Sequence, residues 1–68
     1  SKNLQDTAVA QAEAGVAQAE AVANLALDVA ARNEKLKAEG SVSDVQNRQA
    51  EVNAKQAQAG LALAKAQL

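Results

Sequence analysis

The chain has 68 residues, 49% of them hydrophobic and 22% charged, and its formal net charge at pH 7 is −1. This length allows one small domain at most, and without cysteine or histidine the chain lacks the usual soft ligands for zinc, iron or copper. The near-neutral charge argues against nucleic-acid or anionic-membrane partners, and the absence of aromatic residues argues against a ligand pocket. We therefore expect no cofactor and no metal.

The composition favours α-helix along nearly the whole chain. Alanine supplies 19 residues and glutamine 8, there is no proline, and only three glycines interrupt the sequence. No run of 18 apolar residues could span a bilayer, and the N-terminal residues lack the pattern of a signal peptide. Because the first residue is Ser1 rather than methionine, we expect residues 1–68 to be a single helical unit excised from a longer protein. Removal of an initiator methionine before a small residue would give the same first residue.

The first helix is predicted over about residues 4–39. Asn3 and Asp6 are residue types that cap helix N-termini, and Gly15 costs only about 1 kcal/mol inside so favourable a sequence. At the other end, Lys35 and Lys37 lie where cations meet the negative end of the helix dipole.

A short turn is predicted over about residues 40–42. Gly40 stands where a left-handed residue usually ends a helix. The second helix is predicted over about 43–68, because Ser43 and Gln46 have the spacing of a capping box. So short a connection makes the two helices antiparallel neighbours, which predicts an all-α, two-helix antiparallel coiled-coil hairpin.

Each predicted helix carries a stripe of small residues at heptad spacing. On the first helix the stripe is Val9, Ala12, Val16, Ala19, Ala23, Ala26, Ala30 and Asn33. On the second helix it is Asn47, Ala50, Ala54, Ala57, Leu61, Ala64 and Leu68. If the two stripes are paired about Gly40, Ala23 faces Ala57 and Asn33 faces Asn47. This symmetry predicts the seam between the helices.

A second stripe of mostly larger residues leaves the seam open to another interpretation. It consists of Val22, Leu25, Val29, Arg32 and Leu36, and of Val45, Gln49, Val52, Ala59 and Leu63. These residues could widen the seam, form the true seam while the alanines face outward, or give the hairpin a second face for neighbouring hairpins. An alanine seam is thin, since each alanine in place of leucine forgoes roughly 2 kcal/mol of burial. We therefore expect the isolated hairpin to be marginally stable or to associate.

No set of residues suggests catalysis. Carboxylates such as Glu13 and Glu20 recur at heptad spacing, which is typical of a solvated helix face, and no nucleophile stands beside a base. We expect no catalytic residue and no enzymatic activity.

The residues around the turn carry a resemblance to a known family. Arg32 is followed four residues later by Leu36 and seven residues after that by Ser43. This spacing resembles the hairpin tip of periplasmic adaptor proteins, the membrane fusion proteins of the HlyD, AcrA and MacA type. The flanking segments 24–26 and 58–68 are similar as well, so the resemblance covers essentially the whole chain.

The resemblance implies a protein-binding role in efflux or secretion. In this family the hairpin tips dock onto a TolC-like outer-membrane channel, and neighbouring hairpins gather, commonly as six. It implies a periplasmic location, a parent protein anchored to the inner membrane, and contact with an inner-membrane transporter through domains absent from this chain. Arg32, Leu36 and Ser43 would form the partner-binding tip.

Other interpretations of the same residues remain. Ser43 can serve as a helix cap alone, and the stem of Arg32 can simply cover apolar surface. The hairpin could be a structural coiled-coil spacer without tip function. It could also be a stress-protective amphipathic helix, disordered until dried or bound, although the stop at Gly40 and the restart at Ser43 argue against that.

Overall fold

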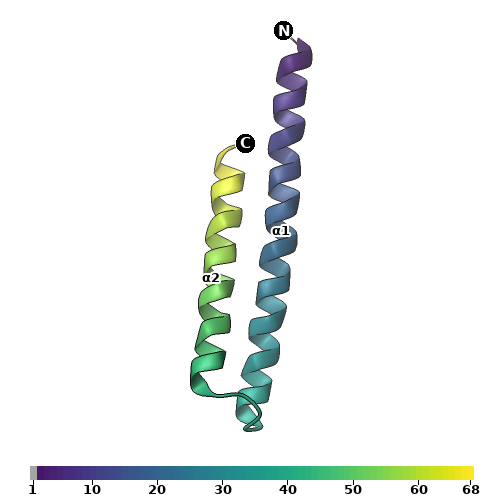
Figure 1. The fold of residues 1–68 in the computed structure, drawn as a ribbon. Helices are drawn as coiled ribbons and strands as arrows, with labels where there is room; N and C mark the ends of the chain where they lie inside the picture. The colour runs from purple at the N-terminus through teal and green to yellow at the C-terminus, as the bar shows by residue number, and fades with distance from the viewer. Residues whose placement is uncertain (1) are drawn as a thin grey trace.

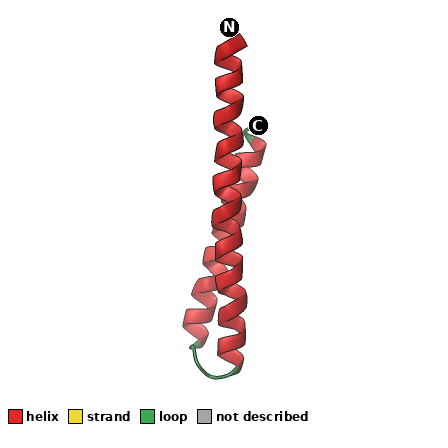
Figure 2. Ribbon diagram, turned by 90° about the vertical axis from the view of Figure 1, so that its right-hand side faces the viewer, coloured by secondary structure: helices red, strands yellow, loops and turns green. Residues whose placement is uncertain are grey.

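The computed structural model describes residues 2–68, with side chains from residue 3, and it contains two α-helices. Helix α1 (Lys2–Ala38) and helix α2 (Asp44–Ala66) run antiparallel and side by side (Figure 1). They form a narrow rod of 58 × 13 × 10 Å, in which α1 extends beyond α2 at the end that holds both termini. The predicted two-helix hairpin is therefore confirmed. Figure 2 shows that α2 crosses α1 at a shallow angle along the rod.

The start of α1 differs from the sequence-based expectation. The helix already includes Lys2, so Asn3 and Asp6 lie within its first turns and do not cap it. The Thr7 hydroxyl donates to the Asn3 carbonyl at 2.9 Å, a bond that helical backbone geometry permits. Leu4 and Gln5 are good helix formers, and neither proline nor glycine stops the helix near residue 4. At the other end of the chain, α2 ends at Ala66, two residues earlier than expected.

The small-residue stripes form the seam between the helices, as predicted. Ala23 is 1% exposed, Ala50 and Ala54 are buried as well, and Asn47 is 3% exposed. The other seam positions are half-buried: Ala12, Val16, Ala19, Ala26, Ala30, Asn33, Ala57, Leu61 and Ala64. Val9 and Leu68, at the outer ends of the two stripes, are exposed.

The stripe of larger residues lies outside the seam. Its valines and leucines are exposed at Val22, Leu25, Val29, Val45, Val52 and Leu63. The possibility that these residues form the true seam is therefore wrong. Small side chains face the partner helix because they let the two helix axes approach closely.

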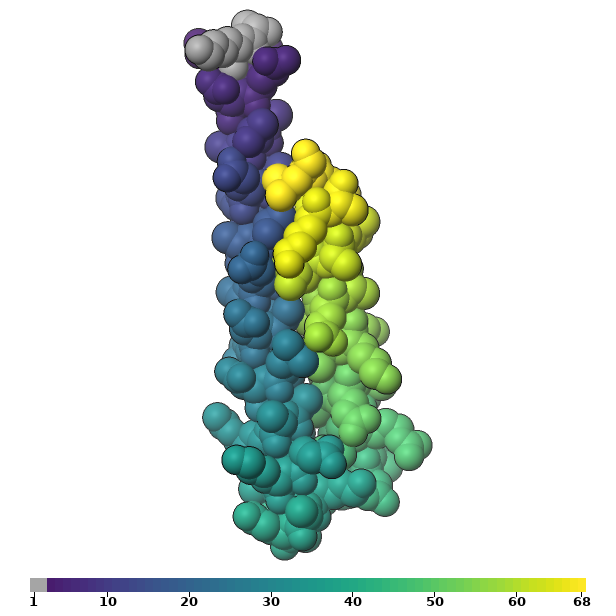
Figure 3. Space-filling model, turned by 180° about the vertical axis from the view of Figure 1, so that it is seen from behind, coloured from purple at the N-terminus to yellow at the C-terminus, as the bar shows by residue number. Residues whose placement is uncertain are grey.

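The resulting core is thin. Within residues 3–68 no large side chain is fully buried, so the helices touch mainly through methyl groups and backbone. The space-filling view shows the two helices in contact along the length that they share (Figure 3). Neither described helix has an 18-residue stretch apolar enough to cross a membrane.

Candidate docking surface at the hairpin tip

The backbone of the turn closes α1 through two hydrogen bonds. The Gly40 N–H donates to the Lys37 carbonyl at 2.9 Å, and the Ser41 N–H donates to the Leu36 carbonyl at 2.7 Å. This pattern is a Schellman motif, and it needs a left-handed residue, which Gly40 supplies with φ of 79°. The predicted stop is confirmed, and the motif fixes the direction in which the chain leaves α1.

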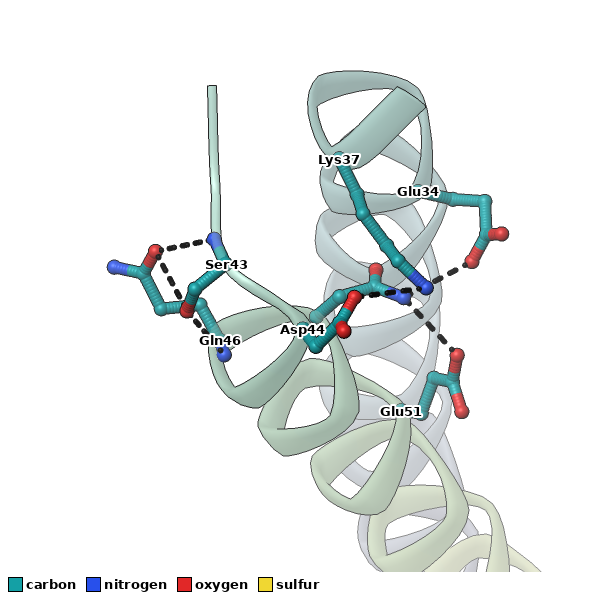
Figure 4. A network of polar contacts seen from close by, with 7 residues as sticks. Glu34, Lys37, Ser43, Asp44, Gln46 and Glu51 are labelled. Atoms are coloured by element: carbon teal, nitrogen blue, oxygen red, sulfur yellow. Dashed lines mark hydrogen bonds and ion pairs between the residues drawn. The ribbon is translucent and has the colours of Figure 1, made fainter. Parts of the chain in front are cut away.

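The start of α2 is held by the predicted capping box. The Ser43 hydroxyl accepts a hydrogen bond from the Gln46 N–H at 3.1 Å, and Gln46 Oε1 accepts one from the Ser43 N–H at 3.0 Å (Figure 4). The hydroxyl also donates to Gln46 Oε1 at 3.4 Å. Two N–H groups that a helix start leaves unpaired are thereby satisfied. Ser43 precedes the helix as its N-cap.

A salt bridge joins the two helices directly behind the turn. Lys37 Nζ lies 3.2 Å from Asp44 Oδ1, and the two side chains are 44% and 79% exposed (Figure 4). At this exposure water screens the pair, which limits its contribution to about 1 kcal/mol or less.

Asn47 is the one strongly buried polar residue among those described. Its Nδ2 donates to Glu34 Oε2 on α1 and to Glu51 Oε1 on α2, each at 3.3 Å, while its Oδ1 is buried without a hydrogen-bond partner. The sequence pairing set Asn47 opposite Asn33, but the amide hydrogen bonds to Glu34 instead. A carboxylate is the stronger acceptor, and Glu34 stands next to Asn33 on the helix. The i, i+4 spacing from Asn47 to Glu51 could have indicated part of this network.

The structure brings the three residues predicted for partner binding to the tip end of the rod. Arg32 and Leu36 lie one turn apart on α1, and Ser43 lies across the turn. Arg32 and Ser43 are exposed. The position of Leu36 outside the stripe of small residues predicts an exposed side chain, but Leu36 is half-buried. Helix α1 ends two residues after Leu36, and the Leu36 carbonyl accepts one of the two hydrogen bonds of the turn. A shallow depression of about 280 Å³ lies beside Arg32, bordered by Asp28, Ala31 and Lys35.

One side of the seam is hollowed and uncharged; we call it the groove face. A hollow of about 580 Å³ is lined by Gly15, Gln18, Ala19, Val22, Ala26, Asn53, Gln56, Ala57 and Gly60. A second, of about 410 Å³ and nearer the tip, is lined by Val29, Asn33, Val45, Gln46, Gln49, Ala50 and Asn53. Because Asn53 borders both hollows, they lie on the same side of the seam. No ionisable side chain lines either one.

The other side of the seam carries the carboxylates of α1. Glu13, Glu20 and Glu34 each follow a seam residue by one position, whereas Val22 and Val29 each precede one. A one-residue step turns a helix by about 100°, so these two sets project to opposite sides of the seam. Basic residues of α2 also follow seam residues by one position, so the hairpin has one uncharged side and one charged side of mixed sign.

Comparisons of this chain with protein-family models, with curated proteins and with solved structures found no match.

Proposed function

We propose that this hairpin is the protein-binding part of a periplasmic adaptor in a tripartite export pump. Its tip docks onto the helical ends of a TolC-type outer-membrane channel, and it performs no catalysis. The observation that carries the proposal is the gathering of Arg32, Leu36 and Ser43 at the single reversal of the chain, in the spacing that resembles adaptor tips.

The chemistry of the tip suits a helical partner. The exposed Arg32 guanidinium can bond carboxylates or the open carbonyl groups at helix ends, and it does so in a planar, bidentate geometry. Leu36, one turn away, presents the exposed part of an apolar side chain beside that cation. A docking contact that joins an apolar anchor to a neighbouring charge gains both affinity and orientation.

The hydrogen bonds of the turn support docking in a second way. The Schellman motif and the capping box hold residues 36–46 in one conformation before any partner arrives. A pre-organised tip loses less conformational entropy on binding. In this proposal Ser43 acts mainly by holding the turn, since its hydroxyl and N–H are both engaged with Gln46.

The remaining parts of the proposal follow the family resemblance. The hairpin works in the periplasm beside neighbouring copies, commonly six, in a parent anchored to the inner membrane. Other domains of that parent contact the transporter. A rod of 58 Å suits the spacing function of such an adaptor.

The test uses an adaptor that carries this hairpin in a working pump. Leu36→Asp should abolish export, because it places a charge without a partner in an apolar contact. Arg32→Ala should reduce export by removing the charge-assisted bonds. The measurement is pump-dependent resistance or secretion, together with adaptor abundance on an immunoblot, so that loss of folding is distinguished from loss of docking.

The matched control is Gln58→Asp, which introduces the same charge at an exposed position far from the tip. It should leave export unchanged. Normal export by a stably expressed Leu36→Asp, Arg32→Ala double variant would refute docking and leave a structural spacer as the function.

A further inference from the structure

The groove face carries an exposed apolar patch in the middle of α1. Val22, Leu25 and Val29 are 53%, 66% and 42% exposed, and their spacing of three and four residues places them on one flank of the helix. An apolar cluster of this kind on a rod with so thin a core favours burial against another surface.

The α2 half of the groove face is different in chemistry. Gln49, Asn53 and Gln56 follow one another along the edges of the two hollows, and each ends in an amide. The α1 half of the groove face is therefore mainly apolar, with amides only toward its ends at Gln18 and Asn33, and the α2 half is richer in amides, with Val45 near the tip. Because neither hollow is lined by a charge, a second copy can approach this face without repulsion between like charges.

The face is large enough for a stable contact. A typical specific interface takes about 800 Å² from each partner, which is less than one-sixth of the 5154 Å² exposed by this hairpin. One broad side of a two-helix rod can supply that area.

Two hairpins can meet face to face about a two-fold axis in only two orientations. If the axis runs along the rod, the tips lie together and α1 of each copy covers α2 of the other. Valines and leucines then cover amides, which leaves buried polar groups without hydrogen bonds. If the axis runs across the rod, the tips point apart, α1 covers α1 and α2 covers α2. Apolar side chains then meet apolar ones, and amides meet amides, which can pair as donor and acceptor.

We propose that the groove face binds a second copy of this chain with the tips pointing apart, forming an antiparallel four-helix bundle. The axis passes near Leu25, which lies in the middle of the section that α1 shares with α2. At the two-fold axis, Leu25 of one copy meets Leu25 of the other, and beside it Val22 of each copy meets Val29 of the other. On the other helix pair, Asn53 meets Gln56. Leu36 then comes opposite Gly15, where the partner helix has no side chain.

This dimer has a consequence for the tip that rests on the proposed function. The contact covers the flank of α1 that bears Arg32 and Leu36. A hairpin paired in this way cannot dock that flank onto a channel, so dimer formation and docking exclude each other.

Cysteine cross-linking of the 68-residue chain tests the orientation, because the chain has no native cysteine. A single Leu25→Cys variant should oxidise to a covalent dimer, since the two-fold axis brings the same residue of both copies together. Leu27→Cys is the matched control, because Leu27 is also exposed but follows the seam residue Ala26 and projects to the charged side. It should cross-link far less.

The opposite orientation gives a different result. With the tips together, the two Leu25 residues lie diagonally across the bundle, beyond the roughly 7 Å between Cα atoms that a disulfide tolerates. Only a mixture of Leu25→Cys and Gln56→Cys chains would then cross-link. That outcome, or equal cross-linking of Leu27→Cys, would overturn the proposal.

Sedimentation equilibrium tests the contact without cysteine. Leu25→Glu should weaken dimerisation roughly tenfold or more, since two like charges would meet at the axis. Leu27→Glu should not weaken it. Circular dichroism on both variants checks that the hairpin is retained. A wild-type chain that stays monomeric up to about 1 mM would also refute the dimer. Neither experiment involves the channel, so the dimer can fail while the proposed docking stands.

Discussion

The tip of this hairpin and its shaft, the section in which α1 and α2 lie side by side along the seam, are stabilised by different kinds of interaction. At the tip, directional hydrogen bonds join residues close in sequence, as in the Ser41–Leu36 bond and the Ser43–Gln46 cap. Along the shaft, methyl groups from distant parts of the chain meet in a seam. The polar contacts that cross between the described parts of the helices, Lys37–Asp44 and Asn47–Glu34, both lie near the tip.

The alignment of the two helices and the attraction between them therefore come from different parts of the hairpin. Directional bonds at the tip fix how the two helices are aligned, because each bond has one geometry. Alanine contacts supply attraction but discriminate weakly between alignments, since one methyl group resembles the next. The larger side chains of the shaft, such as Leu25, lie outside the seam, where a second hairpin can pack against them.

The largest effect should come from a charge in the seam. Ala23→Asp places a carboxylate at a position that is 1% exposed, which should cost more than about 3 kcal/mol and unfold the thin-cored hairpin. Circular dichroism in dilute buffer should show loss of helicity.

Ala21→Asp is the control, because it adds the same residue two positions away on the exposed side of α1. It should change stability by no more than about 0.5 kcal/mol. Equal destabilisation by the two variants would mean that helix propensity, rather than the seam, holds the shaft together.

A smaller effect should come from the turn. Gly40→Ala forces a side chain into a backbone with φ of 79°, at a cost of about 1–2 kcal/mol. Gly60→Ala should act in the opposite direction and stabilise by about 0.5–1 kcal/mol, because Gly60 is helical and nothing lies within 4 Å of its new Cβ. Thermal unfolding at low concentration measures both, and a stabilising Gly40→Ala would contradict the role of the Schellman motif.

The smallest effect should come from the helix cap. Ser43→Ala removes the oxygen that accepts the Gln46 N–H and should cost about 1 kcal/mol. Ser43→Asp keeps an acceptor at the same place and should retain most of the stability. If both variants lose the same amount, the hydroxyl serves something other than the cap.

Much of this fold could be predicted from the sequence because its signals are local. Gly40, Ser43 and Gln46 specify the stop and the restart through backbone geometry and hydrogen bonds within a few residues. Helical periodicity also showed the two stripes that could form the seam, since it sets which residues share a face. Periodicity also set Arg32 and Leu36 on one flank near the turn.

The start of α1 could not be read in the same way. Asn3 and Asp6 are good caps by residue type, yet the helix runs through them. A capping residue begins a helix only where the residues before it are not helical, and the good helix formers Leu4 and Gln5 lie between these two.

The sequence by itself determined that the chain forms two helices, where it reverses, and that two stripes of side chains compete for the seam. Only the tertiary structure decided between those stripes: Ala23 and Ala54 are buried while Leu25 is exposed, because close approach of the axes needs small side chains at the contact. It likewise decided that Asn47 bonds Glu34 rather than Asn33, and that Leu36 is half-buried. Periodicity gives the direction of a side chain, but partners and burial depend on where the second helix lies.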